Sequence, residues 1–343
     1  MIVTESSIMR REIDEIPDAI RRFQRQSGTE AARIGARLRD LDPAVVVTIA
    51  RGSSDHAATY FKYACEIMTG RPVASLGPSV VSVYGTKLAL GGQAALAVSQ
   101  SGKSPDIVAL LAAARAGGAE TIAIGNVEGS PLLEAAAWRL PLHAGPERSV
   151  AATKSFVTSV VAALAILAAR TEDASLSGAL DALPDQLEQA LEQDWSPALD
   201  NCVRAKSLFS LGRGPGFAVA CEAALKLKET SVLHAEAYSG AEVLHGPVSL
   251  VENGFPILAF VPDDAARPGL SEICARVSAS GAALFTVGEA GSGVRLPHVA
   301  TGHALTEPLS MLVSFYRFVE TVARARGQNP DVPRGLKKVT ETV

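Results

Sequence analysis

The sequence predicts an α/β fold made of two tandem three-layer units, each a mostly parallel sheet flanked by helices. Two observations support this fold. Short apolar strands alternate with helical segments, and the pattern of one half returns in the other at a nearly constant offset. The 343 residues are enough for two domains of ordinary size, each with its own core.

The strands of the first half are short and almost continuously apolar. The run V-V-V-T-I-A covers residues 45–50, A-A-L-A-V covers 94–98, and a third run covers 121–124. Such runs are typical of parallel strands that are buried on both faces. Helical patterns follow the first two strands, so the chain repeats strand, helix and strand, as a parallel sheet with crossover helices requires.

The second half repeats the first at an offset of 162 or 163 residues. The matching pairs are Arg51-Gly52 with Arg213-Gly214, Gly118 with Gly281, and Gly125 with Gly288. We therefore expect two copies of one unit. The copies differ in chemistry, because the first has hydroxyls at its strand ends where the second has Asp263 and Asp264. Only the first is expected to hold an anion.

We divide the chain into five parts by these patterns. They are a helical arm (1–44), a first α/β domain (45–172), a helical connector (173–206), a second α/β domain (207–325) and a C-terminal tail (326–343). The apolar run 156–169 is too short to span a bilayer and indicates a buried helix.

Composition excludes several classes of protein. The formal net charge of −4 argues against a nucleic-acid-binding protein, which needs a basic face. The four cysteines form no C-x-x-C pair, which fits a reducing compartment without disulfides or zinc. The sequence shows no signal peptide pattern at its start. We expect a cytoplasmic protein with no cofactor, no metal and no contact with membranes or nucleic acids.

A serine-rich loop lies where the second strand of the first half ends. It reads S-Q-S-G-K-S at residues 99–104 and stands directly before a helix. Ligands of open parallel sheets bind at the carboxyl ends of the strands, and a helix N-terminus favours an anion. The loop is therefore a candidate phosphate site. A solvated turn or an ordinary helix cap is the alternative.

The segment 213–247 carries the candidate catalytic groups. It opens with a glycine turn and contains neither Pro nor Gly from residue 217 to 239, which predicts a helix that fades at Ser239-Gly240. On a helix Lys226 and Glu229 share a face, with Glu222 one turn earlier. His245 follows in a loop. These groups could transfer protons, or they could be a surface ladder of ion pairs beside a structural histidine.

The chain resembles the SIS (sugar isomerase) family of phosphosugar-binding proteins. The resemblance rests on motifs spread over nearly the whole chain: M-R-R-E-I-D-E-I-P at 9–17, S-Q-S-G-K-S at 99–104, E-R-S-V-A-A-T-K-S-F at 147–156, A-L-K-L-K-E-T-S at 224–231, H-A-E-A-Y-S-G-A-E-V-L-H-G-P at 234–247 and P-R-G-L-K-K at 333–338. It is strongest to the isomerase half of glutamine-dependent glucosamine-6-phosphate synthases and to stand-alone deaminases. It implies two tandem SIS-type units.

The resemblance implies roles for individual residues. The phosphate and sugar contacts are expected from Ser53, Ser54, Ser99, Gln100, Ser101, Ser104, Val150 and Ala151. Glu229 is expected to move a proton between C1 and C2, and His245, supplied by a neighbouring subunit, to open the sugar ring. Lys226 is expected near the reacting carbons and Lys338 on the closing tail.

The resemblance also implies a reaction. The synthases carry a glutaminase domain with an N-terminal cysteine, whereas here the isomerase-like region begins within about ten residues of Met1. We therefore expect a deaminase that converts glucosamine 6-phosphate and water into fructose 6-phosphate and ammonia, as a homodimer with a shared active site. Galactosamine 6-phosphate, a sugar–amino acid phosphate adduct, and a non-catalytic phosphosugar sensor are the alternatives.

Overall fold

The computed structural model describes residues 6–338, and these residues form two compact units. The N-terminal unit consists of residues 18–147, 154–181 and 337–338. The C-terminal unit consists of residues 6–17, 148–153 and 182–336. This division follows contacts and interleaves segments of the chain, so the five boundaries drawn from the sequence stay predictions.

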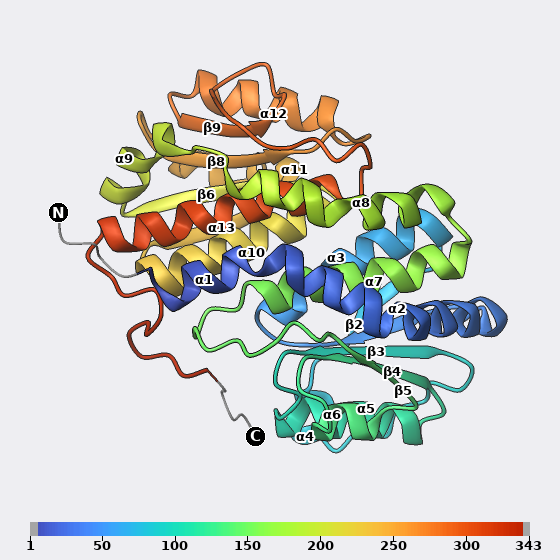
Figure 1. Cartoon of the computed structure of the whole chain (residues 1–343). Helices are drawn as coiled ribbons and strands as arrows, with labels where there is room; N and C mark the ends of the chain where they lie inside the picture. The colour runs from blue at the N-terminus through green and yellow to red at the C-terminus, as the bar shows by residue number, and fades with distance from the viewer. Residues whose placement is uncertain (1–5, 339–343) are drawn as a thin grey trace. The chain divides into compact units, whose positions relative to one another are not determined.

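The N-terminal unit is built on a five-stranded parallel sheet in the order β2-β1-β3-β4-β5. Its strands are β1 (Val46–Ile49), β2 (Val73–Ser75), β3 (Ala94–Ser99), β4 (Glu120–Gly125) and β5 (Trp138–Pro141). Its helices are α3 (Ser53–Thr69), α4 (Ser79–Ser82), α5 (Pro105–Ala116), α6 (Pro131–Ala135) and α7 (Lys154–Thr171), with most of α2 (Ile16–Leu41) and the start of α8 (Ala174–Leu191). Figure 1 shows α4, α5 and α6 along one face of this sheet, with α3 and α7 on the other.

The C-terminal unit is built on a second five-stranded parallel sheet in the order β10-β9-β8-β6-β7. Its strands are β6 (Ser207–Gly212), β7 (His234–Ser239), β8 (Pro256–Val261), β9 (Ala283–Gly288) and β10 (Val294–Leu296). Its helices are α1 (Ile8–Asp14), the end of α8, α9 (Ser196–Arg204), α10 (Pro215–Ser231), α11 (Gly240–Val243), α12 (Arg267–Ala279) and α13 (Glu307–Ala325), with the 3₁₀ turn η1 (Pro247–Leu250).

The two sheets confirm the predicted duplication. Read in chain order, the first strand of each copy lies between the second and the third, with the fourth and fifth beyond. The backbone repeats in detail as well. Gly52 precedes α3 with φ 55° and ψ −135°, and Gly214 precedes α10 with φ 58° and ψ −135°. A side chain at this conformation is strained, so both copies need glycine at the same turn.

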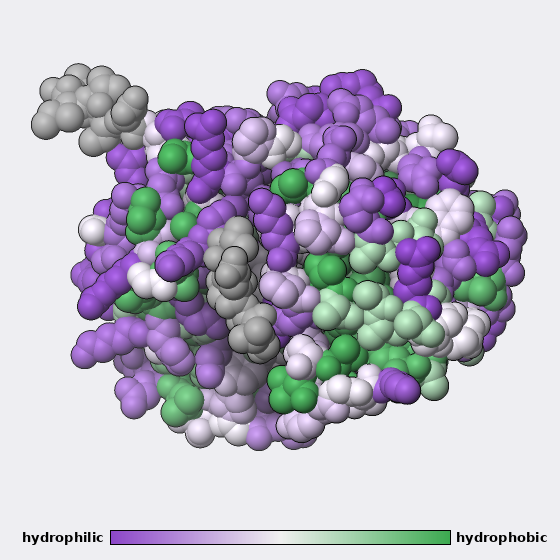
Figure 2. Space-filling model, turned by 90° about the horizontal axis from the view of Figure 1, so that it is seen from below, coloured by the Kyte–Doolittle hydropathy of each residue, from purple (hydrophilic) through white to green (hydrophobic). Residues whose placement is uncertain are grey.

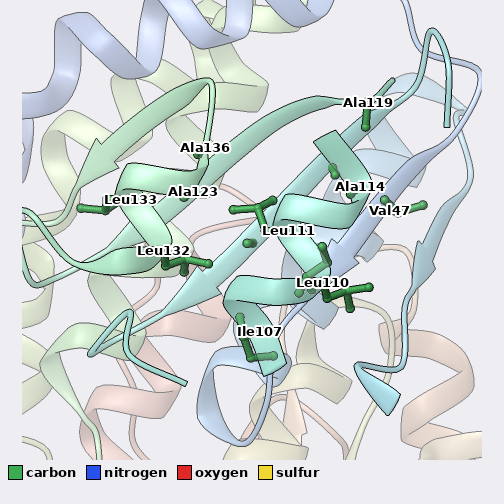
Figure 3. Close-up of a cluster of buried hydrophobic side chains, with 13 residues drawn as sticks. Val47, Ile107, Leu110, Leu111, Ala114, Ala119, Ala123, Leu132, Leu133 and Ala136 are labelled. Atoms are coloured by element: carbon green, nitrogen blue, oxygen red, sulfur yellow. The ribbon is translucent and has the colours of Figure 1, made fainter. Parts of the chain in front are cut away.

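The core of the N-terminal unit lies between its sheet and the helices α5 and α6. Figure 3 shows Leu110, Leu111 and Leu132 of the two helices in the same buried cluster as the small strand residue Ala123. Alanine on the strands lets the helices approach closely, and the leucines fill the space between them. The packing fixes the start of α5, which is where the serine-rich loop ends.

Helix α7 has the length and apolar composition of a membrane span, and it is the one such helix in the described part of the chain. In the structure, 83% of that span is buried. This burial agrees with the prediction of a buried helix, whereas the judgement that the apolar run 156–169 is too short to span a bilayer does not hold for the whole helix, which has 18 residues. The face of the molecule in Figure 2 is mostly hydrophilic, with one larger apolar area and several isolated apolar residues.

The predicted helix from residue 217 to 239 is wrong in its second part. Helix α10 ends at Ser231, Val232 adopts a left-handed conformation with φ 49°, and residues 234–239 form β7. The strand pairs with β6 along its whole length, from Ser207 opposite His234 to Gly212 opposite Ser239. Alanine and glutamate favour helix locally, but sheet pairing outweighs that preference here.

Candidate active site

The switch point of the N-terminal sheet holds four of the predicted phosphate ligands. Strands β1 and β3 are neighbours, and the chain leaves β1 toward one edge of the sheet and β3 toward the other. Ser53 and Ser54 begin α3 just beyond β1, while Ser99 ends β3 and Ser101 follows it. Ligands of open parallel sheets bind at such a crevice. All four serines are half-buried.

The loop 99–104 is held by its own hydroxyls. Ser99 Oγ accepts the N–H of Gly102 at 3.1 Å, and Ser101 Oγ accepts the N–H of Lys103 at 3.3 Å. Each hydroxyl thereby accepts from the backbone and keeps its own proton to donate to a ligand. Gly102 has φ 62°, and a Cβ there would meet Ser130 Oγ at 2.2 Å.

The other two residues of the loop present polar groups as well. Ser104 stands at the N-cap of α5, and its side chain makes no capping bond, so its hydroxyl is not used by its own helix. Gln100 is half-buried, and its backbone carbonyl accepts the backbone N–H of Asn126 at 3.2 Å. The adjacent Lys103 is exposed.

The sequence interpretation missed an ion pair beside this loop. Asp106 in the first turn of α5 is fully buried, binds Arg51 at the end of β1, and accepts the N–H of Ile107 at 2.9 Å. Arg51 is about half exposed and stands two positions before Ser53, and its charge is balanced by Asp106. Arg51 had been noted only as part of the repeat. Its partner is 55 positions away, and sequence spacing alone does not connect them.

Lys338 forms an ion pair inside the N-terminal unit. Its Nζ lies 3.2 Å from Glu147 Oε2. Glu147 also accepts the N–H of Ser155 at 3.1 Å and its hydroxyl at 2.6 Å, at the start of α7. The tail residue predicted to act near the sugar is therefore tied to a buried carboxylate in this structure.

Val150 and Ala151 belong to the C-terminal unit. Glu12 of α1 accepts the N–H groups of Arg148 and Ser149, and the N–H of Val150 donates to the carbonyl of Asp331 at 3.5 Å. Ala151 is buried. The backbone of this predicted sugar-contact segment is thus fixed by residues close to the two ends of the chain.

Helix α10 carries a buried ionic cluster. Lys226 Nζ lies 2.5 Å from Glu229 Oε2 and 3.4 Å from Glu222 Oε1. The side chains of Lys226 and Glu222 are 0% exposed, whereas that of Glu229 is 23% exposed. A surface ladder of ion pairs is therefore excluded. The cluster has one carboxylate open to a ligand and a second one sealed behind the lysine.

The sealed end of the cluster is closed by α13. Tyr316, fully buried, donates its hydroxyl to Glu222 Oε1 at 3.2 Å. Burial by itself would lower the pKa of Lys226, but the two neighbouring carboxylates raise it above its ordinary value. Lys226 is accordingly an ammonium at neutral pH. Tyr316 was not found from the sequence, because it lies 94 positions from its partner.

His245 stands apart from this cluster. It lies in the turn after α11 and is exposed, and its N–H donates to the carbonyl of Glu242 at 3.0 Å. Within residues 6–338 of this one chain, no hydrogen bond or ion pair joins its ring to Glu229. The structure therefore brings Lys226 and Glu229 together but leaves His245 available for contacts outside its own turn. The same residues contain no group of three or more side chains suited to hold a metal ion.

Known proteins share both halves of this arrangement. The profile of the SIS domain matches residues 43–169 and 203–285, which is one match to each sheet. The chain belongs to the SIS domain family. The predicted family and fold class are thereby confirmed.

Individual SIS proteins align with nearly the whole chain. A candidate phosphosugar isomerase from Silicibacter pomeroyi DSS-3 is 53% identical, with a TM-score of 0.92 over 95% of this chain and 100% of that one. The C-terminal domain of glucosamine-fructose-6-phosphate aminotransferase from Francisella tularensis is 25% identical, with a TM-score of 0.85 over 97% of this chain and 100% of that domain.

The curated SIS relatives are longer than this chain. The glutamine–fructose-6-phosphate aminotransferase (isomerizing) of Symbiobacterium thermophilum is 34% identical over 96% of this chain, but the match spans 58% of that protein. The activity of the full-length relative is therefore not assigned to this chain.

Proposed function

We propose that this SIS protein releases the amine of an amino sugar phosphate, most readily from glucosamine 6-phosphate. The observation that carries the proposal is the cluster on α10, in which a partly exposed carboxylate, Glu229, lies 2.5 Å from a buried ammonium, Lys226. One carboxylate that accepts and returns a proton is what aldose–ketose transfer requires. The serine-lined switch point of the other sheet supplies hydroxyls for the phosphate.

The proposed reaction begins with ring opening, in which His245 transfers the proton of the C1 hydroxyl to the ring oxygen as the bond between C1 and that oxygen breaks. Glu229 then takes the proton from C2 and returns it to C1, while the C1 oxygen gains the proton that the amine loses, which converts the 2-amino aldose into a 2-imino ketose. The ammonium of Lys226 stabilises the negative charge that develops on the substrate in between. Water adds to C2 and ammonia leaves, so that glucosamine 6-phosphate and water give fructose 6-phosphate and ammonia.

In this proposal the remaining predicted residues bind the substrate. The phosphate is held by Ser53, Ser54, Ser99, Gln100, Ser101 and Ser104, the sugar contacts Val150 and Ala151, and Lys338 approaches the reacting carbons. Lys338 must leave Glu147 to do so. Glu147 is 0% exposed and Lys338 is 24% exposed, so the exchange leaves a buried carboxylate that keeps its two hydrogen bonds from Ser155 and needs a new cationic partner.

The test is ammonia release by the purified full chain from glucosamine 6-phosphate. Glu229→Gln is expected to lower kcat about 10²–10⁴-fold with little change in KM, since the amide cannot carry the proton. Glu272→Gln, the same change at an exposed position of α12, serves as the matched control and is expected to behave like the unmodified protein.

The alternatives give different outcomes in the same assay. Faster amine release from galactosamine 6-phosphate or from a sugar–amino acid phosphate adduct would change the assigned substrate and leave the proposed mechanism unchanged. Phosphosugar binding without turnover, identical for the unmodified protein and Glu229→Gln, would make the chain a sensor and refute the proposal.

We propose further that the active protein is a cytoplasmic homodimer. The exposure of His245 supports a role for a second copy, because its ring makes no hydrogen bond or ion pair within residues 6–338 of its own chain. Mass measurement at assay concentration tests the dimer, and an active monomer would refute it.

A further inference from the structure

The C-terminal unit contains a cavity that the proposed reaction does not use. It has a volume of about 300 Å³ and lies where β8 and β9 end, beside the first turns of α12 and α13. The residues that line it and matter below are Val261, Asp263, Arg267, His298, His303 and Glu307. All belong to the same unit.

This cavity occupies the position of the serine-rich loop in the other copy. At the offset of 162, Val261 corresponds to Ser99 and Asp263 to Ser101. Glu307 is the first residue of α13, just as Lys154 is the first residue of α7. One hydroxyl and an ammonium are thus replaced by carboxylates, and the other hydroxyl is replaced by a valine side chain. The cavity of the second copy therefore lies where the first copy has its candidate phosphate site, but it carries carboxylates in place of groups that attract an anion.

Glu307 is the deepest charged group of the cavity, with its side chain 6% exposed. Its Oε1 accepts the N–H of Asp263 and lies 3.1 Å from His298 Nε2. Its Oε2 has no partner within residues 6–338, yet it is not among their sealed, unpaired atoms, so it faces the cavity. Burial by itself would raise the pKa of Glu307, but its hydrogen bonds with His298 and Asp263 hold the pKa below the ordinary value.

The other charges of the cavity are paired at its rim. Asp263 binds Arg267 at 2.8 Å and Glu289 binds Arg295, and all four side chains are 41–67% exposed. Exposed pairs of this kind cancel most of their field in water. The least exposed charge in the cavity is therefore the ionised Glu307, which Arg267 also attracts from the rim. An anion such as a phosphate would be repelled there.

His303 supplies a second, complementary group. Its Nδ1 accepts the N–H of Leu305 at 3.1 Å, which places the ring proton on Nε2. The cavity thus offers a charged acceptor at its base and a neutral donor on its wall. A ligand that fits both carries an ammonium for the carboxylate and a hydroxyl for the imidazole.

We propose that this cavity is a second ligand site, specific for a small hydroxylated amine without a phosphate. The ammonium of the ligand binds Glu307 Oε2, and one of its hydroxyls accepts from His303 Nε2. The proposal stands on the cavity itself and does not depend on the reaction proposed above.

Calorimetric titration of the full chain with glucosamine tests this site, with glucose as the uncharged match. Glucosamine is expected to bind at least tenfold more tightly than glucose, since a hydrogen bond to a charged group is about twice as strong as a neutral one. Glu307→Gln is expected to weaken glucosamine binding about tenfold or more. Glu272→Gln, outside the cavity, is expected to leave it unchanged.

Three results would overturn the proposal: equal affinity for glucose, unchanged affinity in Glu307→Gln, or displacement of glucosamine by fructose 6-phosphate. The last result would place glucosamine in the phosphosugar site instead. If Glu307→Gln does not fold, a crystal of the unmodified protein soaked with glucosamine decides the matter. An amine within hydrogen-bond distance of Glu307 Oε2 supports the proposal, and an amine elsewhere or an empty cavity refutes it.

Discussion

Removal of the ammonium from the α10 cluster should destabilise the C-terminal unit strongly. In Lys226→Met the side-chain volume is nearly kept, but Glu222, 0% exposed, loses its counterion and retains only weaker partners such as Tyr316. Breaking a buried pair in this way costs about 3–5 kcal/mol. At a urea dependence of about 2–3 kcal/mol per molar, the unfolding midpoint should fall by about 1–2 M.

The assay can be restricted to the unit that contains the cluster. The chain has two tryptophans, and Trp195 packs against Phe260, Phe315 and Phe318 in the C-terminal unit. In a Trp138→Phe background, fluorescence during urea unfolding therefore reports this unit alone.

A second substitution makes the reasoning refutable. Glu222→Gln in the Lys226→Met protein removes the stranded charge and keeps an acceptor for Tyr316, so it should restore at least half of the lost stability. If Lys226→Met costs less than about 1 kcal/mol, or if Glu222→Gln restores nothing, the cluster does not stabilise the fold by charge compensation.

The same variant predicts a pH dependence. The pKa of Lys226 is raised above its ordinary value of 10.5 by the two carboxylates, against the effect of burial. The ion pairs therefore contribute fully below 10.5, and their contribution is lost as the pH rises through the higher pKa of the folded state. The stability difference between the unmodified protein and Lys226→Met should stay constant from neutral pH to about 10 and shrink above that.

Two further predictions concern the backbone and the thiols. Gly214→Ala should lower the free energy of unfolding by about 1–3 kcal/mol, because φ 58° with ψ −135° is open only to glycine. Gly28→Ala in the middle of α2 should raise it by about 0.5–1 kcal/mol, because a Cβ there meets no other atom. Urea unfolding of both variants checks this, and equal effects would contradict it. Burial raises the pKa of Cys202 and of Cys274 to about 12, so an aromatic disulfide reagent at pH 8 should modify half-buried Cys221 well before either. Mass spectrometry of the modified peptides identifies the order, and early labelling of Cys274 would contradict it.

The sequence was most informative where the pattern was local or repeated. Apolar runs located β1, β3 and β4, and the glycine offset of 162 or 163 revealed the second sheet, because both copies use the same glycine turn between strand and helix. The pairing of Lys226 with Glu229 followed from helical spacing alone.

The sequence failed where distant residues decide the structure. The strand β7 was assigned to a helix, since its pairing with β6 is not visible in local preferences. Arg51 with Asp106, and Tyr316 with Glu222, are joined only by the folded chain. Such contacts fix the orientation of the candidate site, which is why residue types could be predicted and their supports could not.

The burial of α7 has a practical consequence for anyone who shortens this protein. Its sequence is apolar enough to cross a bilayer, and the packed fold is what keeps 83% of that span out of water. A fragment that contained residues 154–171 without their packing partners would expose a hydrophobic surface, which promotes aggregation or insertion into a membrane. Expression of isolated halves should therefore be judged first by whether this helix stays covered.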